Sequence, residues 1–181
     1  MDGSGGRKVI EPPIEPSIEP WMRGPLEGVH PLLAPLFYSF QMAREDLALH
    51  TATLSQRDLW ARPFGLTPVG FHIRHISGSA DRLLAYLQGR ELTPAQLTAM
   101  DAESGPDEPT REQLLLAMEN VFREAEAVVR ALDTSTLSHA RTVGRKRLPT
   151  TVIGVLTHMA EHTQRHVGQA IAAAKLVAAL A

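Results

Sequence analysis

Apolar residues recur along this chain at spacings of three and four, the spacing of one face of an α-helix. Four segments show the pattern, at about residues 30–53, 67–88, 110–132 and 150–178. No segment shows convincing alternation of apolar and polar residues, which is typical of half-buried strands. The pattern therefore predicts an all-α protein built as a four-helix bundle.

Helix start and stop signals support these segments. Thr67-Pro68 places an N-cap residue before a proline that suits the first helical position, and Gly89 ends the same segment. Thr110-Arg111-Glu112-Gln113 has the spacing of a capping box and opens the third segment. The expected helices therefore have defined ends as well as an apolar face.

Two longer connections are expected, one between helices two and three and one between helices three and four. Residues 92–109 contain three X-Pro dipeptides, so we expect a connection with one short helical turn near residues 95–100. This connection is long enough to be a crossover between helices two and three, along the bundle. Residues 133–149 are expected to form a loop with a turn at Gly144.

Ile-Glu-Pro occurs three times between residues 10 and 20, at a period of four. Each proline removes a backbone donor and disfavours the α region for the residue before it. We therefore expect residues 1–27 to be an extended or disordered proline-rich arm, and residues 28–181 to form the helical bundle. The arm could pack on a partner or lie on its own domain.

Three of the eight histidines, His158, His162 and His166, are spaced by four residues in the last helical segment. Residues four apart lie one above the other on a helix face, so these imidazoles form a ladder. Two imidazoles one turn apart can bind the same divalent ion, each through a nitrogen lone pair. A third ligand from another helix would complete such a site.

His72 and His75 in the second segment are the candidates for this third ligand, and they share a helix face. The apolar stripe of that segment, which includes Ile73, Ile76 and Ala80, lies closer to His72 than to His75 at about 100° per residue. Periodicity alone therefore favours His72.

Two short blocks carry a family resemblance. Phe71-His72-Ile73-Arg74-His75-Ile76-Ser77-Gly78-Ser79 and His162-Thr163-Gln164-Arg165-His166-Val167-Gly168-Gln169 resemble the DinB/YfiT-like superfamily of metal-dependent enzymes, over about residues 30–176. The resemblance implies a four-helix bundle with a long crossover. It also implies that the metal ligands are His75, His162 and His166, which replaces the choice of His72. His72 and His158 remain weaker candidates.

A second interpretation of the ladder concerns Glu161. His158-Met159-Ala160-Glu161-His162 spells the H-x-x-E-H signature of inverted zinc proteases, in which the glutamate activates water. That interpretation would leave His166 without a role, so Glu161 is only a weak catalytic candidate. Gln169, with Glu161 and Ser79 as weaker choices, is the expected hydrogen-bond partner of the ligating imidazoles.

Three imidazoles on Zn²⁺ or Ni²⁺ leave positions at which water or a thiol can be activated. The resemblance implies similarity to thiol-dependent transferases and isomerases, in which a low-molecular-weight thiol is activated. Arg74, Arg82, Arg165 and the Arg145-Lys146-Arg147 cluster could receive carboxylates of such a thiol or of a small-molecule substrate.

Composition excludes some classes of ligand and of chemistry for this protein. A net charge of -2 over 181 residues gives no general attraction for nucleic acid, and the absence of cysteine excludes thiolate ligands and a cysteine nucleophile. The chain shows neither a signal peptide nor an apolar run that could span a membrane, so a cytoplasmic location is expected. Because helical bundles of this kind commonly pair, we expect a homodimer.

The sequence leaves two functions open. The first is a metal-dependent transferase or hydrolase that activates a water or a thiol. The second is a non-catalytic metal-binding bundle, such as a stress-response or sensor protein, whose ion stabilises the fold. An open coordination position beside a pocket favours the first, and a closed four-ligand site favours the second.

Overall fold

The computed structural model describes residues 18–105 and 108–180. Four long helices dominate it: α1 (Ala34–His50), α3 (Val69–Leu87), α5 (Arg111–Arg130) and α6 (Val152–Leu180). The shorter elements of the described part are α2 (Gln56–Trp60), α4 (Pro94–Ala102) and the 3₁₀ turns η1 (Pro20–Met22), η2 (Pro63–Gly65) and η3 (Thr134–Thr136). The prediction of a mainly helical protein is confirmed.

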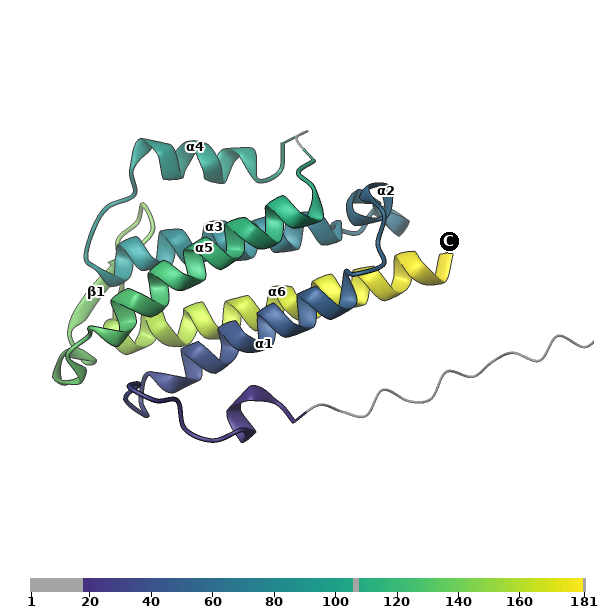
Figure 1. Cartoon of the computed structure of the whole chain (residues 1–181). Helices are drawn as coiled ribbons and strands as arrows, with labels where there is room; N and C mark the ends of the chain where they lie inside the picture. Colours follow the sequence, from purple (N-terminus) through teal and green to yellow (C-terminus); the bar gives the residue numbers. More distant parts are fainter. Residues whose placement is uncertain (1–17, 106–107, 181) are drawn as a thin grey trace, which may run out of the picture.

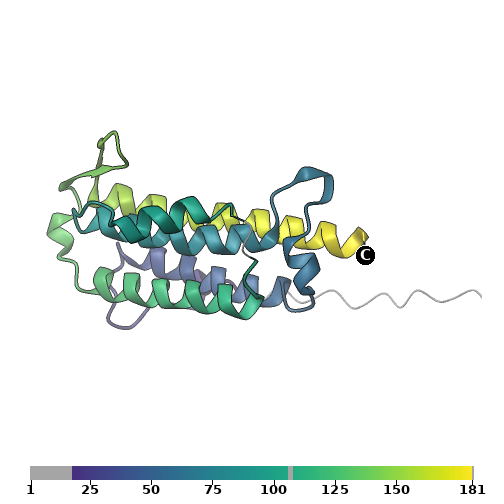
Figure 2. The same cartoon turned by 90° about the horizontal axis from the view of Figure 1, so that it is seen from above.

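The four long helices pack along one another (Figures 1 and 2). Helix α3 packs against α5 and α6, and α1 packs against the same two helices. Helix α4 runs back along the outside of α3, so that α3 and α5 point in the same direction (Figure 1). The segment predicted to cross over therefore does so, with a nine-residue helix in place of the expected single turn.

The predicted end of α3 and the predicted start of α5 are present. The expected Thr67 cap is wrong, because Pro68 occupies the N-cap of α3 and no side chain caps that helix. At the start of α5, Thr110 accepts from the backbone N–H of Gln113, and the Gln113 side chain accepts from the backbone N–H of Thr110. After α3, Gly89 takes a φ of +73°, which glycine adopts without steric cost. Both ends follow from local residues, which is why the sequence could predict them.

Buried apolar side chains from all four long helices form one core. At its centre Phe40 of α1 stacks on Phe122 of α5, with ring centroids 3.8 Å apart. Both rings are fully buried, and burial of each aromatic side chain stabilises the fold by roughly 2–3 kcal/mol. This core fixes the helices that carry the histidines.

The expectation of a purely helical protein is wrong in one place. The predicted loop contains two short antiparallel strands, β1 (Ala140–Val143) and β2 (Leu148–Thr151), paired from Ala140↔Thr151 to Val143↔Leu148. The four residues of each strand, Ala-Arg-Thr-Val and Leu-Pro-Thr-Thr, do not alternate between apolar and polar, so the sequence pattern did not reveal them. Gly144 and Arg147, both with positive φ, form the turn between them.

The N-terminal prediction concerns residues that are only partly described. Residues 1–17 lie outside the described part, so the extended arm stays a prediction there. Pro20, the last proline of the repeat, opens η1, where a missing N–H costs nothing. Arg23 then forms two hydrogen bonds of 2.6 Å with the carboxylate of Glu45 on α1.

Within the described residues, no helix is both long enough and apolar enough to cross a lipid bilayer.

Candidate metal centre

Helices α3 and α6 bring three histidines together. One ring nitrogen from each of His75, His162 and His166 can be chosen so that all three lie within 4.8 Å of one another. The ring centroids are 4.5 Å apart for His75–His166 and for His162–His166, and 5.1 Å apart for His75–His162. This triangle of imidazoles from two helices could hold a divalent metal ion.

His162 and His166 are neutral at physiological pH. Burial lowers the pKa of both to about 4, and the repulsion that a second protonated ring would meet beside His75 acts in the same direction. A neutral imidazole keeps the lone pair that a metal ion requires. His162 and His166 therefore need to lose no proton before they can bind a cation near pH 7.

In two of the three rings, His75 and His166, one nitrogen is already hydrogen-bonded. His75 Nδ1 lies 2.6 Å from Oε2 of Glu103, and His166 Nδ1 lies 3.0 Å from Nδ1 of His72. Each pairing leaves Nε2 of the ligand ring for a metal. Ligating histidines in metalloproteins usually have such a partner on the other nitrogen, so the residues present fit a three-histidine metal centre.

His72 lies behind this centre. Its side chain is buried, and burial, followed by the repulsion that a second protonated ring would meet beside His75, lowers its pKa to about 4. Periodicity predicted correctly that His72 lies closer to the core than His75. The structure pairs His72 with His166 and leaves it outside the group of three.

Glu103, at the end of α4, is the residue that the sequence did not reveal. It is only 7% exposed, and its carboxylate accepts hydrogen bonds from His75 and from the guanidinium of Arg82. Burial alone would raise the pKa of Glu103, but these two partners outweigh it and hold the pKa below its ordinary value. A buried carboxylate therefore lies directly beside a candidate ligand.

His158, the third histidine of the ladder, lies at the surface with Glu161 and Arg165. His158 Nδ1 is 2.6 Å from Oε1 of Glu161, and Arg165 donates to the other oxygen of the same carboxylate. Both members of the His158–Glu161 pair are more than 40% exposed. Glu161 therefore pairs with neighbours on its own helix, whereas His166, idle in the inverted-protease interpretation, belongs to the group of three.

The expected hydrogen-bond partners of the ligands differ from the observed ones. We expected Gln169, Glu161 or Ser79, whereas the structure gives Glu103 to His75 and His72 to His166. Glu103 stands 28 positions from His75 in a segment expected to be a connection. Only Gly78 hinted at it, because a glycine within a helix can mark the close approach of another group.

Arg74 and Arg82 connect α3 to the end of α4. Arg74 donates to the backbone carbonyls of Ala102 and Glu103 at 3.0 and 3.2 Å, and its guanidinium lies over the ring of Trp60. The Arg82 side chain is 11% exposed and pairs with the Glu103 carboxylate. Both arginines thus hold Glu103 in place.

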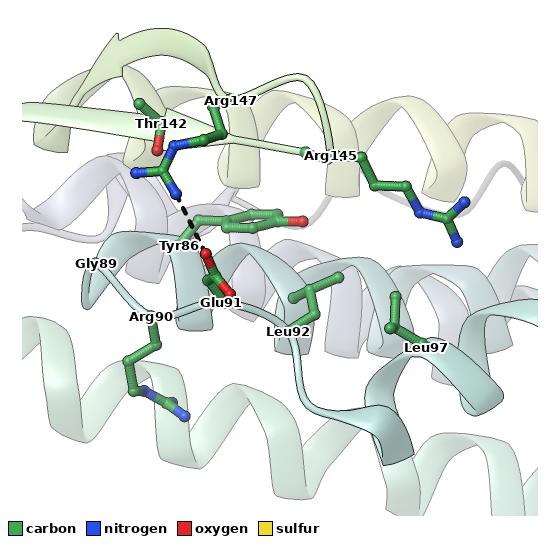
Figure 3. A pocket seen from close by; sticks show the side chains of 10 residues that line it. Tyr86, Gly89, Arg90, Glu91, Leu92, Leu97, Thr142, Arg145 and Arg147 are labelled. Carbon is green, nitrogen blue, oxygen red and sulfur yellow. Dashed lines mark hydrogen bonds and ion pairs between the residues drawn. The ribbon is translucent and has the colours of Figure 1, made fainter.

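The predicted basic cluster lies on the hairpin, beside a cavity of about 330 Å³ at the C-terminal end of α3 (Figure 3). Arg147 reaches Glu91 at 3.2 Å, and the side chains of Arg90 and Arg145 point away from the Tyr86 ring (Figure 3). The cationic groups therefore do not converge on one point in this cavity.

Two further cavities occupy other faces. One, of about 620 Å³, is a mainly apolar groove between α1 and α6, and one, of about 500 Å³, lies among α3, α4 and α5 with Glu103 in its wall. None of the three cavities described here is lined by His75, His162 or His166. The candidate metal centre lies at the α3–α6 contact, outside them.

Comparison with known proteins identifies a family. No curated protein shows a significant match to the chain. The family model described as the DinB superfamily matches residues 39–170, which include α3, α4, α5 and the ladder histidines of α6. By this match over most of its length, together with the three-histidine group, the chain belongs to the DinB superfamily.

Proposed function

We propose that this protein is a metal-dependent enzyme whose ion, Zn²⁺ or Ni²⁺, is held by His75, His162 and His166. The observation that carries the proposal is the convergence of these three ring nitrogens from α3 and α6. Imidazole suits both ions, and three protein ligands leave coordination positions open, as in catalytic zinc sites. The four long helices are, in this proposal, the family's four-helix bundle and the frame of the site.

A divalent ion in this position supplies a Lewis acid that lowers the pKa of a water or a low-molecular-weight thiol. The chain's own residues already have the protonation state and the exposure to solvent that binding of the ion requires. The lowered pKa values of His162 and His166 keep both rings neutral, and all three ligand rings are partly exposed, which leaves a path from solvent. The reaction class that fits is transfer or hydrolysis with an activated thiol or water.

A second candidate function is supported by one observation. None of the three cavities described above is lined by His75, His162 or His166. An enzyme needs room for a small-molecule substrate beside its ion, whereas a stabilising ion does not. A non-catalytic metal-binding bundle, in which the ion joins α3 to α6, is therefore the alternative.

Metal uptake and thiol binding separate these functions. We expect the purified chain to take up about one Zn²⁺ or Ni²⁺, measured by elemental analysis, and to melt at a higher temperature when the metal is added. Absence of uptake would overturn both functions. A further shift caused by low-molecular-weight thiols, only in the metal-loaded protein, supports the enzyme; metal binding without any thiol or hydrolytic response supports the alternative.

A further inference from the structure

Glu103 is a buried charged residue with a specific set of partners. Its side chain is 8% exposed, and it lies just after α4, on the crossover outside the core helices. A buried carboxylate is costly unless it is paired and hydrogen-bonded. Here Oε2 faces His75 and Oε1 faces Arg82, so each carboxylate oxygen has a partner on α3.

Helix α3 leaves space for this carboxylate. His75, Gly78 and Arg82 lie on one face of α3, at spacings of three and four residues. A Cβ atom at position 78 would overlap the Glu103 carboxylate, so only glycine admits the carboxylate between the two partners. The backbone carbonyl of Glu103 is also held, by Arg74 at 3.2 Å. Side chain and backbone are therefore both fixed against α3.

The two partners determine how His75 is protonated. An ionised carboxylate only accepts hydrogen bonds, and Arg82 only donates them, so the Oε2 of Glu103 requires a proton on Nδ1 of His75. A neutral imidazole with its proton on Nδ1 has its lone pair on Nε2. The carboxylate thus selects the tautomer and the ring orientation that a metal ligand needs.

We propose that Glu103 is the positioning residue of the metal centre. The crossover places Glu103 beside α3, where it fixes the tautomer of His75 so that Nε2 faces the ion. This inference rests on the proposed function for its metal, but the tautomer it assigns belongs to the metal-free chain. It adds a third element, the crossover with α4, to a site otherwise built by α3 and α6.

The variant Glu103→Gln tests this assignment with little change of shape. Because Arg82 only donates, it keeps the amide oxygen, and the amide NH₂ then faces Nδ1 of His75. The proton of His75 must move to Nε2, the atom that would bind the ion. Long-range ¹H–¹⁵N NMR of the metal-free protein at pH 8 should show the proton on Nδ1 in the wild type and on Nε2 in the variant.

Glu161 offers a matched control, because it also lies between a histidine and an arginine, at the same 2.6 Å from a histidine Nδ1, but at the surface. Glu103→Gln should weaken zinc binding by about 10- to 100-fold, because the loss of an outer hydrogen-bond partner of a ligating histidine typically lowers the metal affinity by this factor. Glu161→Gln should leave the affinity within about twofold of the wild type. Competition with a chromophoric zinc chelator measures both.

The results separate this inference from the function on which it rests. A wild-type His75 with its proton on Nε2, or a Glu103→Gln variant that binds zinc like the wild type, would overturn the role of Glu103. A wild-type chain that takes up no zinc would instead overturn the proposed function, and the NMR measurement would still decide the tautomer. If Glu103→Gln does not fold, the wild-type tautomer alone decides.

Discussion

Two histidine–glutamate pairs in this molecule have the same separation and different surroundings. Nδ1 of His75 and Nδ1 of His158 each lie 2.6 Å from a carboxylate oxygen, of Glu103 and Glu161 respectively. The first pair joins α3 to the crossover, and its carboxylate is buried. The second lies on the exposed face of α6. Contact distance alone therefore says little about what a pair contributes.

The difference follows from solvent. Exposed ion pairs contribute between about 0 and 1 kcal/mol, because water and salt screen the charges. A buried carboxylate has no water to replace a lost partner, so removing one member of the pair is costly. The Glu103 carboxylate can therefore fix the orientation of the His75 ring, whereas the exposed Glu161 carboxylate cannot fix that of His158.

The largest expected effect concerns the ligands themselves. His166→Ala or His75→Ala should abolish tight zinc binding, because each removes one of three protein ligands, whereas His158→Ala should largely retain it. Elemental analysis of the three purified variants after dialysis checks this. Full zinc content in the first two variants would refute the assignment of the group of three.

The second effect concerns stability without metal. Glu103→Ala should cost about 3–5 kcal/mol of unfolding free energy, because it leaves the guanidinium of Arg82 buried without its partner. Urea denaturation in the presence of a chelator measures the loss. The double variant Glu103→Leu, Arg82→Met removes both charges, so it should be less destabilised than the single one; equal loss in both would show that the pairing is not the cause.

The third effect is a pH dependence of the metal-free protein. Because the pKa of His72 is lowered from 6.5 to about 4, the unfolded chain takes up its proton first as the pH falls. Stability is therefore fully present above about pH 6.5 and declines between 6.5 and 4, by on the order of 2 kcal/mol from His72 at pH 4.5. Denaturation at pH 7.5 and 4.5 measures it. His72→Gln should remove the share of His72 and leave the shares of His162 and His166, whose pKa is also about 4.

The smallest effect belongs to the exposed pair. Glu161→Ala should change the unfolding free energy by about 0.5 kcal/mol or less, and less still in 1 M salt, because His158 and Arg165 remain solvated. Denaturation at low and high salt checks this. A loss comparable to that of Glu103→Ala would remove the distinction between the two pairs.

Local pattern explains what the sequence could predict. The spacing of His158, His162 and His166 showed a shared helix face, and the capping box at Thr110 marked the start of α5. Both depend on neighbours in the chain. The choice between His72 and His75 needed the family resemblance, because the apolar stripe reports burial and not which ring lies against both His162 and His166.

Tertiary contacts explain what it could not predict. Glu103 differs in no local respect from other acidic residues of its segment, such as Asp101, and only the return of the crossover places it beside His75. The sequences of β1 and β2 do not alternate between apolar and polar residues, so no period of two marks them. For Glu103, the deciding information lies in residues far apart along the chain.

The last structural consequence concerns the distance in sequence between the ligands. His75 on α3 and His162 on α6 stand 87 positions apart in the sequence. An ion between them acts as a cross-link that exists only when both helices are docked. Release of zinc to a fluorescent dye would therefore report global unfolding in real time, without any label attached to the protein.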